Sequence, residues 1–463
     1  MKEAEVYPYI PNSVPAVKQE MLDEVGISSV EEIFAEIPDR LRFKGELKTP
    51  GPYHAEAALR RHVEGILDKN KDCKEYIGFL GGGIYNHYVP SVVTTIMGRD
   101  EFLTSYVGEA FADHGKWQAQ FEYASCMAEL LEMDALNTPT YDWGMAAATV
   151  IRMGARINGR SEALVSAIMS PDRLSCMRNY TWSTVPTIIP VEHDPETGLL
   201  DLDDLKKKMT DKVAVFYYEN PSFLGVIEHQ GAAIAEIVHG AGGVVAAGVD
   251  PISLGVLEAP ARYGVDIACG DIQGLGIPMQ CGGGQGGFIA TQDEPTYFAE
   301  FNALMFGVTP TIVDGEYGFG EVYFERTSYA SREKAKDFLG TMAQLHGIGA
   351  GVYLSLMGPQ GMREIGEGIM QRSAYLAKQL DNLPGIKAPQ FSAPFFKEFV
   401  VNFDGTGTSV ADINAALLDR KIFGGKDLSE WFPALGQSAL YCVTEVHSKD
   451  DLDALVGALK EIL

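Results

Sequence analysis

Residues 266–291 of this 463-residue chain read DIACGDIQGLGIPMQCGGGQGGFIAT, and this stretch decides the fold class. It starts as a short apolar strand at residues 267–269 and continues as a loop that is dense in glycine. Glycine permits positive φ angles and close approach of the backbone, at an entropic cost that an ordinary surface turn has no reason to carry. We therefore expect this glycine loop to line a site or a subunit contact.

The sequence around the loop alternates between short apolar strands and helices. We expect strands at residues 162–166, 185–190, 213–218, 244–247, 267–269 and 287–291. Helices are expected between them, at residues 173–180, 203–209 and 230–240. This alternation predicts right-handed crossovers and an α/β fold, with a mainly parallel sheet that carries helices on both faces.

The flanking sequence predicts three domains, at residues 1–75, 76–330 and 331–463. The first is a helical, amphipathic segment that suits a layer packing on a partner or on the main domain. The second is the large α/β domain, which also contains helices at residues 117–131 and 142–155. The third is a smaller α+β domain, and we expect its helices at residues 334–356, 361–380, 410–418 and 449–463 and its strands at residues 398–403 and 438–443.

The composition is that of an acidic globular protein. The formal net charge of −26 would repel the phosphate backbone of a nucleic acid. No run approaches 18 apolar residues and the N-terminus lacks an apolar signal segment, so we expect neither a membrane span nor secretion. A cytoplasmic location is the simplest interpretation.

The six cysteines form no CxxC pair and fit no zinc spacing. Free thiols in a reducing compartment are therefore expected. Cys269 and Cys281 flank the glycine loop, where either could be reactive, although a role in filling the core is more usual for a free cysteine.

The order of strand, aspartate, second strand and glycine loop is typical of one cofactor chemistry. Pyridoxal-phosphate enzymes of the aspartate-aminotransferase type place an aspartate after one strand to pair the pyridinium nitrogen, and a lysine further on to form a Schiff base. Asp250 stands in the place of the aspartate, and Gln273 stands near the place of the lysine. An amide cannot form an imine, and no lysine lies between Lys212 and Lys334. We therefore expect no covalently bound cofactor on this chain.

A second glycine cluster, FLGGGIYNHYVPSVV at residues 79–93, brings Tyr85, His87 and Tyr88 next to a glycine hinge. Aromatic rings and a histidine in such a place can line a polar pocket, because sites concentrate on loops held by a rigid scaffold. The alternative is a loop whose aromatic side chains pack against the core.

The chain resembles the glycine cleavage system P-protein, specifically the α half of the split form, from about residue 9 to the last helix. The resemblance is carried by the joint order of several segments. They are YIPN (9–12), SVEEIFAEIP (29–38), FLGGGIYNHYVPSVV, FEYASCMAELLEMDALN (121–137), ENPSFLGVIE (219–228), DPISLGVLEAPARYGVDIACGDIQGLGIP (250–278), SREKA (331–335) and GVYLSLMGPQGMREI (351–365).

This resemblance implies the fold of a type I pyridoxal-phosphate enzyme and a role in decarboxylating glycine, with the aminomethyl group passed to the lipoyl arm of the carrier H-protein. It implies that pyridoxal phosphate sits on a homologous, lysine-bearing β chain, in a dimer or heterotetramer. The α chain would complete a pocket near the subunit interface. The candidates for lining it are Tyr85, His87, Tyr88, Glu109, His114, Asp250 and Gln273.

The resemblance is weakest at residues 107–117, VGEAFADHGKW, where the family has a segment like YQPEISQG. Trp143 also replaces a small residue of the family pattern, and residues 336–341 depart from it as well. Glu109, Asp113 and His114 could bind a cationic group of another substrate. A divergent subunit that serves a decarboxylase or lyase for another amino acid or amine is therefore the second hypothesis.

The altered residues could also join His87 and Asp250 as nitrogen and oxygen ligands of a metal. Acids and histidines in loops are more often solvated or hydrogen-bonded, so no metal is predicted. A third hypothesis belongs to another class of protein: the chain is a noncatalytic scaffold, a pseudoenzyme that stabilises its partner.

Overall fold

The computed structural model describes residues 6–7, 9–45, 47–103, 114–323, 325, 327–337, 339–340 and 342–463. The chain divides into two compact units, residues 1–70 and residues 71–463. The first unit holds the helices α1 (Pro15–Val25) and α2 (Glu56–Leu67) together with three 3₁₀ turns. The second unit contains the sheets, and the division of that unit at residue 330 stays a prediction.

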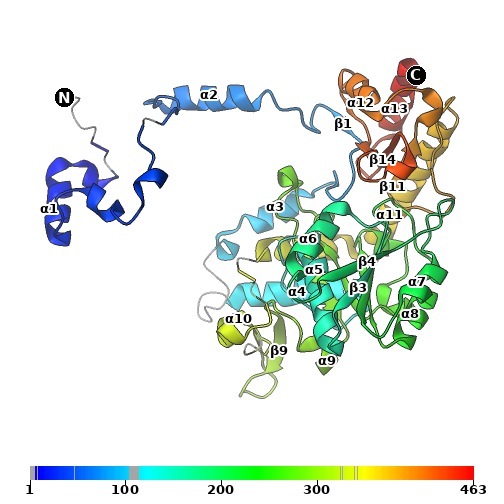
Figure 1. Cartoon of the computed structure of the whole chain (residues 1–463), viewed down its shortest axis with the longest axis horizontal. Helices are drawn as coiled ribbons and strands as arrows, with labels where there is room; N and C mark the ends of the chain where they lie inside the picture. Colours follow the sequence, from blue (N-terminus) through cyan, green and yellow to red (C-terminus); the bar gives the residue numbers. More distant parts are fainter. Residues whose placement is uncertain are drawn as a thin grey trace. The chain divides into compact units, whose positions relative to one another are not determined.

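A seven-stranded sheet forms the centre of the second unit (Figure 1). Its order is β2-β8-β7-β6-β5-β3-β4. The strands β4, β3, β5, β6 and β7 run parallel, whereas β8 is antiparallel to β7 and β2 is antiparallel to β8. Their bounds are β2 (Ala135–Leu136), β3 (Glu162–Ser166), β4 (Thr187–Val191), β5 (Val213–Asn220), β6 (Val244–Val249), β7 (Ile267–Asp271) and β8 (Gly287–Thr291). The predicted mainly parallel α/β sheet is confirmed.

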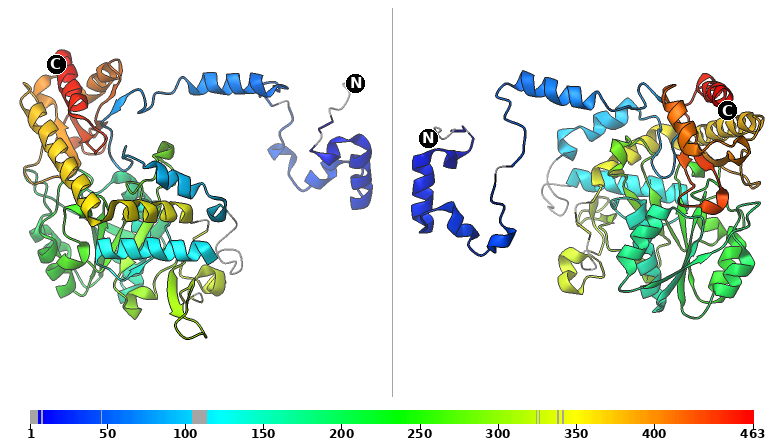
Figure 2. Two further views of the ribbon diagram at one scale, coloured as in Figure 1. Left: turned by 180° about the vertical axis from the view of Figure 1, so that it is seen from behind. Right: turned by 45° about the horizontal axis from the view of Figure 1, so that its top comes forward.

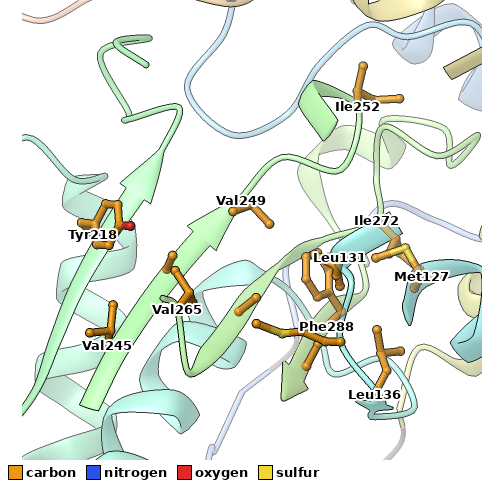
Figure 3. Close-up of a cluster of buried hydrophobic side chains, with 14 of the residues drawn as sticks. Met127, Leu131, Leu136, Tyr218, Val245, Val249, Ile252, Val265, Ile272 and Phe288 are labelled. Carbon is orange, nitrogen blue, oxygen red and sulfur yellow. The ribbon is translucent and has the colours of Figure 1, made fainter. Parts of the chain in front are cut away.

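Both faces of this sheet are covered, because alternate residues of each strand point to opposite sides. Tyr217 of β5 packs with α5 (Trp143–Asn158) and α6 (Pro171–Thr181). Phe216 and Tyr218 pack on the other side, against α4 (His114–Leu131), α7 (Leu202–Lys208), α8 (Gly231–Gly240) and α11 (Gln344–Asp381). Figure 3 shows part of this second layer, with Tyr218 on its strand and Met127 on α4.

The C-terminal part forms a smaller layer around the antiparallel sheet β11-β14-β13. Its strands are β11 (Glu398–Asn402), β13 (Lys426–Asp427) and β14 (Ser438–Cys442), and α12 (Val410–Leu418) and α13 (Lys449–Ile462) pack on it. A two-stranded parallel pairing joins β1 (Ile77–Gly78) to β12 (Ile422–Phe423). The segment that follows β1, residues 79–88, therefore starts beside this C-terminal layer.

The structure differs from the sequence-based expectation at several short strands, at the start of α11 and at one hairpin. The helix expected from residue 334 begins only at Gln344, because residues 335–337, 339–340 and 342–343 form no regular structure. It then continues as α11 past a kink at Gly358, which has φ 58° and precedes Pro359. Figure 2 shows the first half of α11 beside α4. The hairpin β9 (Phe306–Pro310) with β10 (Tyr317–Glu321) was not predicted.

Three further helices are short: α3 (Ser91–Met97), α9 (Pro295–Phe298) and α10 (Ser328–Ser331). In the described parts of the chain, no helix combines the length and apolar character that crossing a membrane requires.

Candidate functional site

Charged side chains gather where the parallel strands β5, β6 and β7 end. Glu219 lies near the end of β5, Asp250 follows β6 directly, and Asp271 ends β7. In open α/β sheets the carboxyl ends of parallel strands are the usual place for a ligand. In this chain, residues 79–88 and the start of β11 also lie at this edge of the sheet.

The centre of the cluster is Lys397, a residue just before β11 whose exposed fraction is only 3%. Its Nζ lies 2.6 Å from Oδ2 of Asp250 and 3.2 Å from Nε2 of His87. The ammonium also sits 3.3 Å from the centroid of the Tyr85 ring, a cation–π contact. Burial lowers the pKa of Lys397, but the negative charges of Asp250 and Glu398 outweigh it, so the net pKa is raised and the amine is charged.

His87 connects this lysine to Glu445. Because Nε2 faces an ammonium group, which only donates, the hydrogen-bond network assigns the ring proton to Nδ1. Nδ1 then donates to Oε2 of Glu445 at 2.8 Å, while the Tyr88 amide donates to Oε1 at 2.7 Å. Burial opposes the charge of Glu445, but the His87 ring and nearby backbone amides outweigh burial and lower the pKa of Glu445 to about 2. Glu445 is therefore ionised at neutral pH.

Gln273 fastens the second glycine cluster to the glycine loop. Its Oε1 accepts from the Tyr85 amide at 3.0 Å, and its Nε2 donates to the carbonyl oxygens of Tyr85 and Ile277, both at 3.0 Å. The Tyr85 hydroxyl donates to Oε2 of Glu398 at 2.9 Å. Burial, followed by the charges of Glu398 and Asp250, raises the pKa of Tyr85, so this phenol remains a donor. All of the polar groups of Gln273 are used within the chain.

Arg173 closes the opposite side of the cluster. It makes a bidentate ion pair with Glu219, with Nε–Oε1 and Nη2–Oε2 distances of 2.6 and 2.8 Å. Its guanidinium carbon lies 4.1 Å from the centroid of the Trp143 ring, and the Trp143 indole donates to the Tyr217 hydroxyl at 2.9 Å. Gly248 leaves room for this indole, because a Cβ atom there would come within 2.8 Å of it. Trp143, which departs from the family pattern, therefore fills space above β6.

The space that remains between these side chains is about 20 Å³, which is room for about one water molecule. A pocket for a small organic ligand takes roughly 300 Å³ or more. Asp250, the residue expected from the sequence to pair a pyridinium nitrogen, is bound to Lys397. The N-terminus of α5 is closed by the Asp142 carboxylate, which accepts from the Met145 amide at 2.7 Å and would repel a phosphate. Pyridoxal phosphate therefore does not fit this site.

Four of the predicted site residues are brought together: Tyr85, His87, Asp250 and Gln273. Tyr88 joins through its backbone amide alone, because its side chain is 63% exposed. Glu109 lies outside the described residues, as does Asp113, and His114 is the first residue of α4.

Sequence reasoning missed Lys397, Glu398, Glu445, Arg173 and Glu219. One signal for the first two is visible in the sequence PFFKEFVV at residues 394–401, where a lysine and a glutamate enter an apolar strand. Charges in such a place must be paired when the strand is buried. The pairing itself could not be read from the sequence, because the partners lie more than a hundred residues away.

The glycine loop divides into two halves with different surroundings. Residues 271–277 are buried and carry the Gln273 contacts, whereas residues 280–284 are exposed. Cys281 is exposed at φ 56°, so it does not fill the core, while Cys269 is buried and its thiol pKa is raised by burial. All six cysteines are free. In the part of the chain that the structure describes, no group of three or more potential ligand residues could hold a metal ion.

We predict that the buried carboxyl group of Asp271 makes the free energy of unfolding of this chain depend on pH. Burial, with a further contribution from Asp250, raises its pKa to about 7, and its Oδ2 has no hydrogen-bond partner. Between pH 4 and 7 the folded state therefore holds a proton that the unfolded state has lost, so the free energy of unfolding falls as the pH rises. Asp271→Asn should gain about 2–3 kcal/mol relative to the wild type between pH 5 and pH 8.

Urea denaturation at pH 5, 6, 7 and 8 measures this difference. The matched control is Asp314→Asn, because Asp314 is exposed. Its stability difference from the wild type should not change with pH. A constant difference for Asp271→Asn as well would show that Asp271 is ionised throughout this range.

Known proteins resemble this chain along nearly its whole length. Residues 8–459 match the family described as "Glycine cleavage system P-protein". The chain is 37% identical to a "Probable glycine dehydrogenase (decarboxylating) subunit 1" from Staphylothermus marinus, covering 99% of this chain and 98% of that protein. A crystal structure of glycine decarboxylase (P-protein) in inhibitor-bound form matches 99% of this chain and 100% of its own, with a TM-score of 0.85 and 32% identity.

A more distant structure shares the fold alone. The sphingosine-1-phosphate lyase of Burkholderia pseudomallei is 12% identical and has a TM-score of 0.65, with 92% of this chain and 94% of the lyase covered. The expected type I pyridoxal-phosphate fold is confirmed by these likenesses.

Proposed function

The chain belongs to the glycine cleavage system P-protein family, as a relative of glycine dehydrogenase (decarboxylating) subunit 1, and on that premise we propose that it completes the active site of a partner. The partner is a homologous chain that carries the Schiff-base lysine and the pyridoxal phosphate. The pair decarboxylates glycine and passes the aminomethyl group to a lipoyl carrier protein. One observation supports this division of labour above all others. Asp250, the aspartate that would pair with the cofactor, forms an ion pair with Lys397 of this chain instead.

The interior cluster has a positioning role in this proposal. Tyr85, His87 and Gln273 are at most 7% exposed and their polar groups are engaged within the chain, so they do not reach a partner's substrate. They fix the course of residues 79–88 and of the glycine loop. The groups presented outward from these segments include the side chains of Leu80 and Tyr88, together with Pro278 and residues 280–284. These exposed parts are the ones that complete a pocket formed with the partner.

The subunit-1 relationship favours glycine as the substrate, and the site of this chain offers no competing chemistry. A self-filled site of about 20 Å³ takes neither glycine nor another amino acid. Substrate selection therefore lies in the pocket that the two chains share. The same filled site would also suit a scaffold, so the experiment must separate assistance in catalysis from mere stabilisation.

Co-expression with a homologous lysine-bearing chain tests the proposal. The expected result is a stable complex that exchanges labelled bicarbonate into the carboxyl group of glycine, at a rate at least 100-fold above that of either chain alone. This chain by itself should show no visible absorbance after incubation with pyridoxal phosphate and dialysis. The control is the lysine-bearing chain alone at the same concentration.

Three other outcomes contradict the proposal, each in a different way. Visible absorbance on this chain alone would show that its own site holds the cofactor. Equal exchange by the partner alone would reduce this chain to a scaffold. A complex that is inert with glycine and active on another amino acid would establish the divergent subunit instead.

A further inference from the structure

A short turn that follows β14, residues 444–447, contacts the second glycine cluster on both sides of its three glycines. The contacted part of the chain, residues 78–88, is named the hinge segment. The turn is itself fixed, because Nε of Arg372 on α11 donates to the carbonyl oxygen of His447 at 3.0 Å. The turn and the hinge segment both lie within the second compact unit, so their contacts are made inside one body of the structure.

The turn supplies hydrogen bonds that the hinge segment cannot make by itself. After β1 this segment contains no helix or strand apart from one bridge to β14, so its backbone groups need partners from elsewhere. Nε2 of His447 donates to the Gly78 carbonyl oxygen at 2.9 Å, while Nδ1 of the same ring accepts from the Thr444 amide at 3.0 Å. The Thr444 hydroxyl donates to the Asn86 carbonyl oxygen at 2.6 Å. The turn therefore holds the chain before and after the glycines.

Glu445 is the residue of the turn at which only one kind of group fits. Its Oε2 accepts from Nδ1 of His87 at 2.8 Å, and its Oε1 accepts from the Tyr88 amide at 2.7 Å. The other nitrogen of the His87 ring faces the ammonium of Lys397, which keeps the ring proton on Nδ1. Both groups that face Glu445 are thus donors. An amide in place of the carboxylate would turn its own NH2 group toward one of them.

One carboxylate therefore orients two consecutive residues of the hinge segment. It holds the ring of His87 and the peptide N–H that follows it, so it fixes the plane of the peptide bond between residues 87 and 88. The direction in which the Tyr88 side chain leaves the backbone depends on that plane. Glu445 touches none of the groups that would react, and its effect passes through the backbone of the hinge segment.

We propose that Glu445 is a positioning residue for the reaction of the complex, acting through His87 and the Tyr88 amide to hold the hinge segment in the shape that the shared pocket requires. This inference rests on the proposed function, which assigns the segment to that pocket. A displacement of about 1 Å in a supporting part of an enzyme can slow its reaction roughly 100-fold. Thr444 and His447 fasten the two ends of the segment that Glu445 orients.

Glu445→Gln in the full-length chain, co-expressed with a homologous lysine-bearing chain, tests this role. The kcat of the exchange of bicarbonate into glycine should fall at least 10-fold. The KM for glycine and the Kd between the two chains should each change less than threefold, because Glu445 offers glycine no group to bind.

The matched control is Glu300→Gln. The Glu300 side chain is 12% exposed, against 15% for Glu445, and its charged partners are Arg156 and Lys336 rather than the hinge segment. Its kcat should stay within twofold of the wild type. Thr444→Val is the second test variant, since it removes the bond to Asn86 and changes no charge. It should lower kcat at least threefold, and it keeps the proposal falsifiable if Glu445→Gln does not fold.

Nitrogen NMR of the free chain with isotope-labelled histidine observes the arrangement directly. His87 should carry its proton on Nδ1, and His447, which donates from Nε2, should show the opposite tautomer. His87→Gln identifies the His87 signal by its loss. In Glu445→Gln the His87 ring should no longer show a single Nδ1-protonated form, while His447 should be unchanged. A wild-type His87 ring protonated on Nε2 would overturn the proposed role.

The exchange measurements separate this inference from the proposed function. A wild-type complex that is inert with glycine contradicts the proposed function, and the positioning role falls with it. An active wild-type complex in which Glu445→Gln and Thr444→Val both react at the wild-type rate overturns the positioning role alone. Equal losses of kcat in Glu445→Gln and Glu300→Gln also overturn it, because general stability would then control the rate. A loss confined to Kd would make the turn a docking element instead.

Discussion

Lys397→Met is expected to lower the free energy of unfolding by about 3–5 kcal/mol, the usual cost of removing one partner from a buried ion pair. The substitution leaves Asp250 without its cation, in a place where the carboxylate is 8% exposed. It also takes a donor from His87 and the cation from the face of the Tyr85 ring. Urea denaturation of the full-length chain at pH 7 measures the loss.

The double variant Lys397→Met/Asp250→Asn distinguishes the ion pair from simple packing. Removing both charges should recover at least half of the loss, because no unpaired charge remains buried. The control Lys387→Met, at an exposed lysine ten residues earlier, should stay within about 0.5 kcal/mol of the wild type. Equal losses in the single and double variants would mean that Asp250 and Lys397 are not coupled.

Gly225→Ala is expected to prevent folding or to cost more than about 4 kcal/mol, the range reserved for backbone strain combined with overpacking. Gly225 has φ +88°, and a Cβ atom there would lie 1.9 Å from the carbonyl oxygen of Glu398. A backbone oxygen cannot rotate away as a flexible side chain would. The substitution would therefore separate the loop after β5 from β11, and with it Glu398 from Tyr85.

Gly159→Ala is the matched control, because Gly159 has φ +71° and nothing within 4 Å of its would-be Cβ atom. Gly159→Ala should lower the free energy of unfolding by about 1 kcal/mol, the cost of holding alanine in a left-handed conformation without a steric clash. Thermal and urea denaturation of both variants give the comparison. Similar losses for the two would show that conformational preference, rather than close packing, sets the requirement at Gly225.

The sequence predicts the central sheet well because each strand there is a short apolar run bounded by turns. Residues 213–218 and 244–247 are apolar on both faces, as expected for strands covered on two sides, and they became β5 and β6. The start of α11 was harder to predict, because the helical composition of residues 335–337 was overridden by the structure around them. The hairpin of β9 and β10 is exposed along much of its length and lacks the apolar alternation that marks a half-buried strand.

The candidate site was predicted in part, for reasons that lie in distance along the chain. Asp250 and Gln273 are recognisable because they belong to one continuous order of strands and loop. Their contacts come from elsewhere: Tyr85 reaches Gln273 across 188 residues, and Lys397 reaches His87 across 310. Local pattern contains no signal for such pairings. Because no lysine lies near Gln273 in the sequence, Lys397, just before β11, was not recognised as part of the site.

The pairing of Lys397 with Asp250 bears on how this chain could change in evolution. A single mutation that placed a lysine at position 273 would leave Asp250 paired with Lys397 and the cavity at about 20 Å³. Losing Lys397 alone would leave Asp250 buried without its cation and would lower the stability of the fold. Neither the loss of Lys397 nor a lysine at position 273 is therefore favourable as a first change. A change that freed Asp250 for another ligand would thus have to break the buried Lys397–Asp250 ion pair, at the cost in stability that breaking such a pair carries.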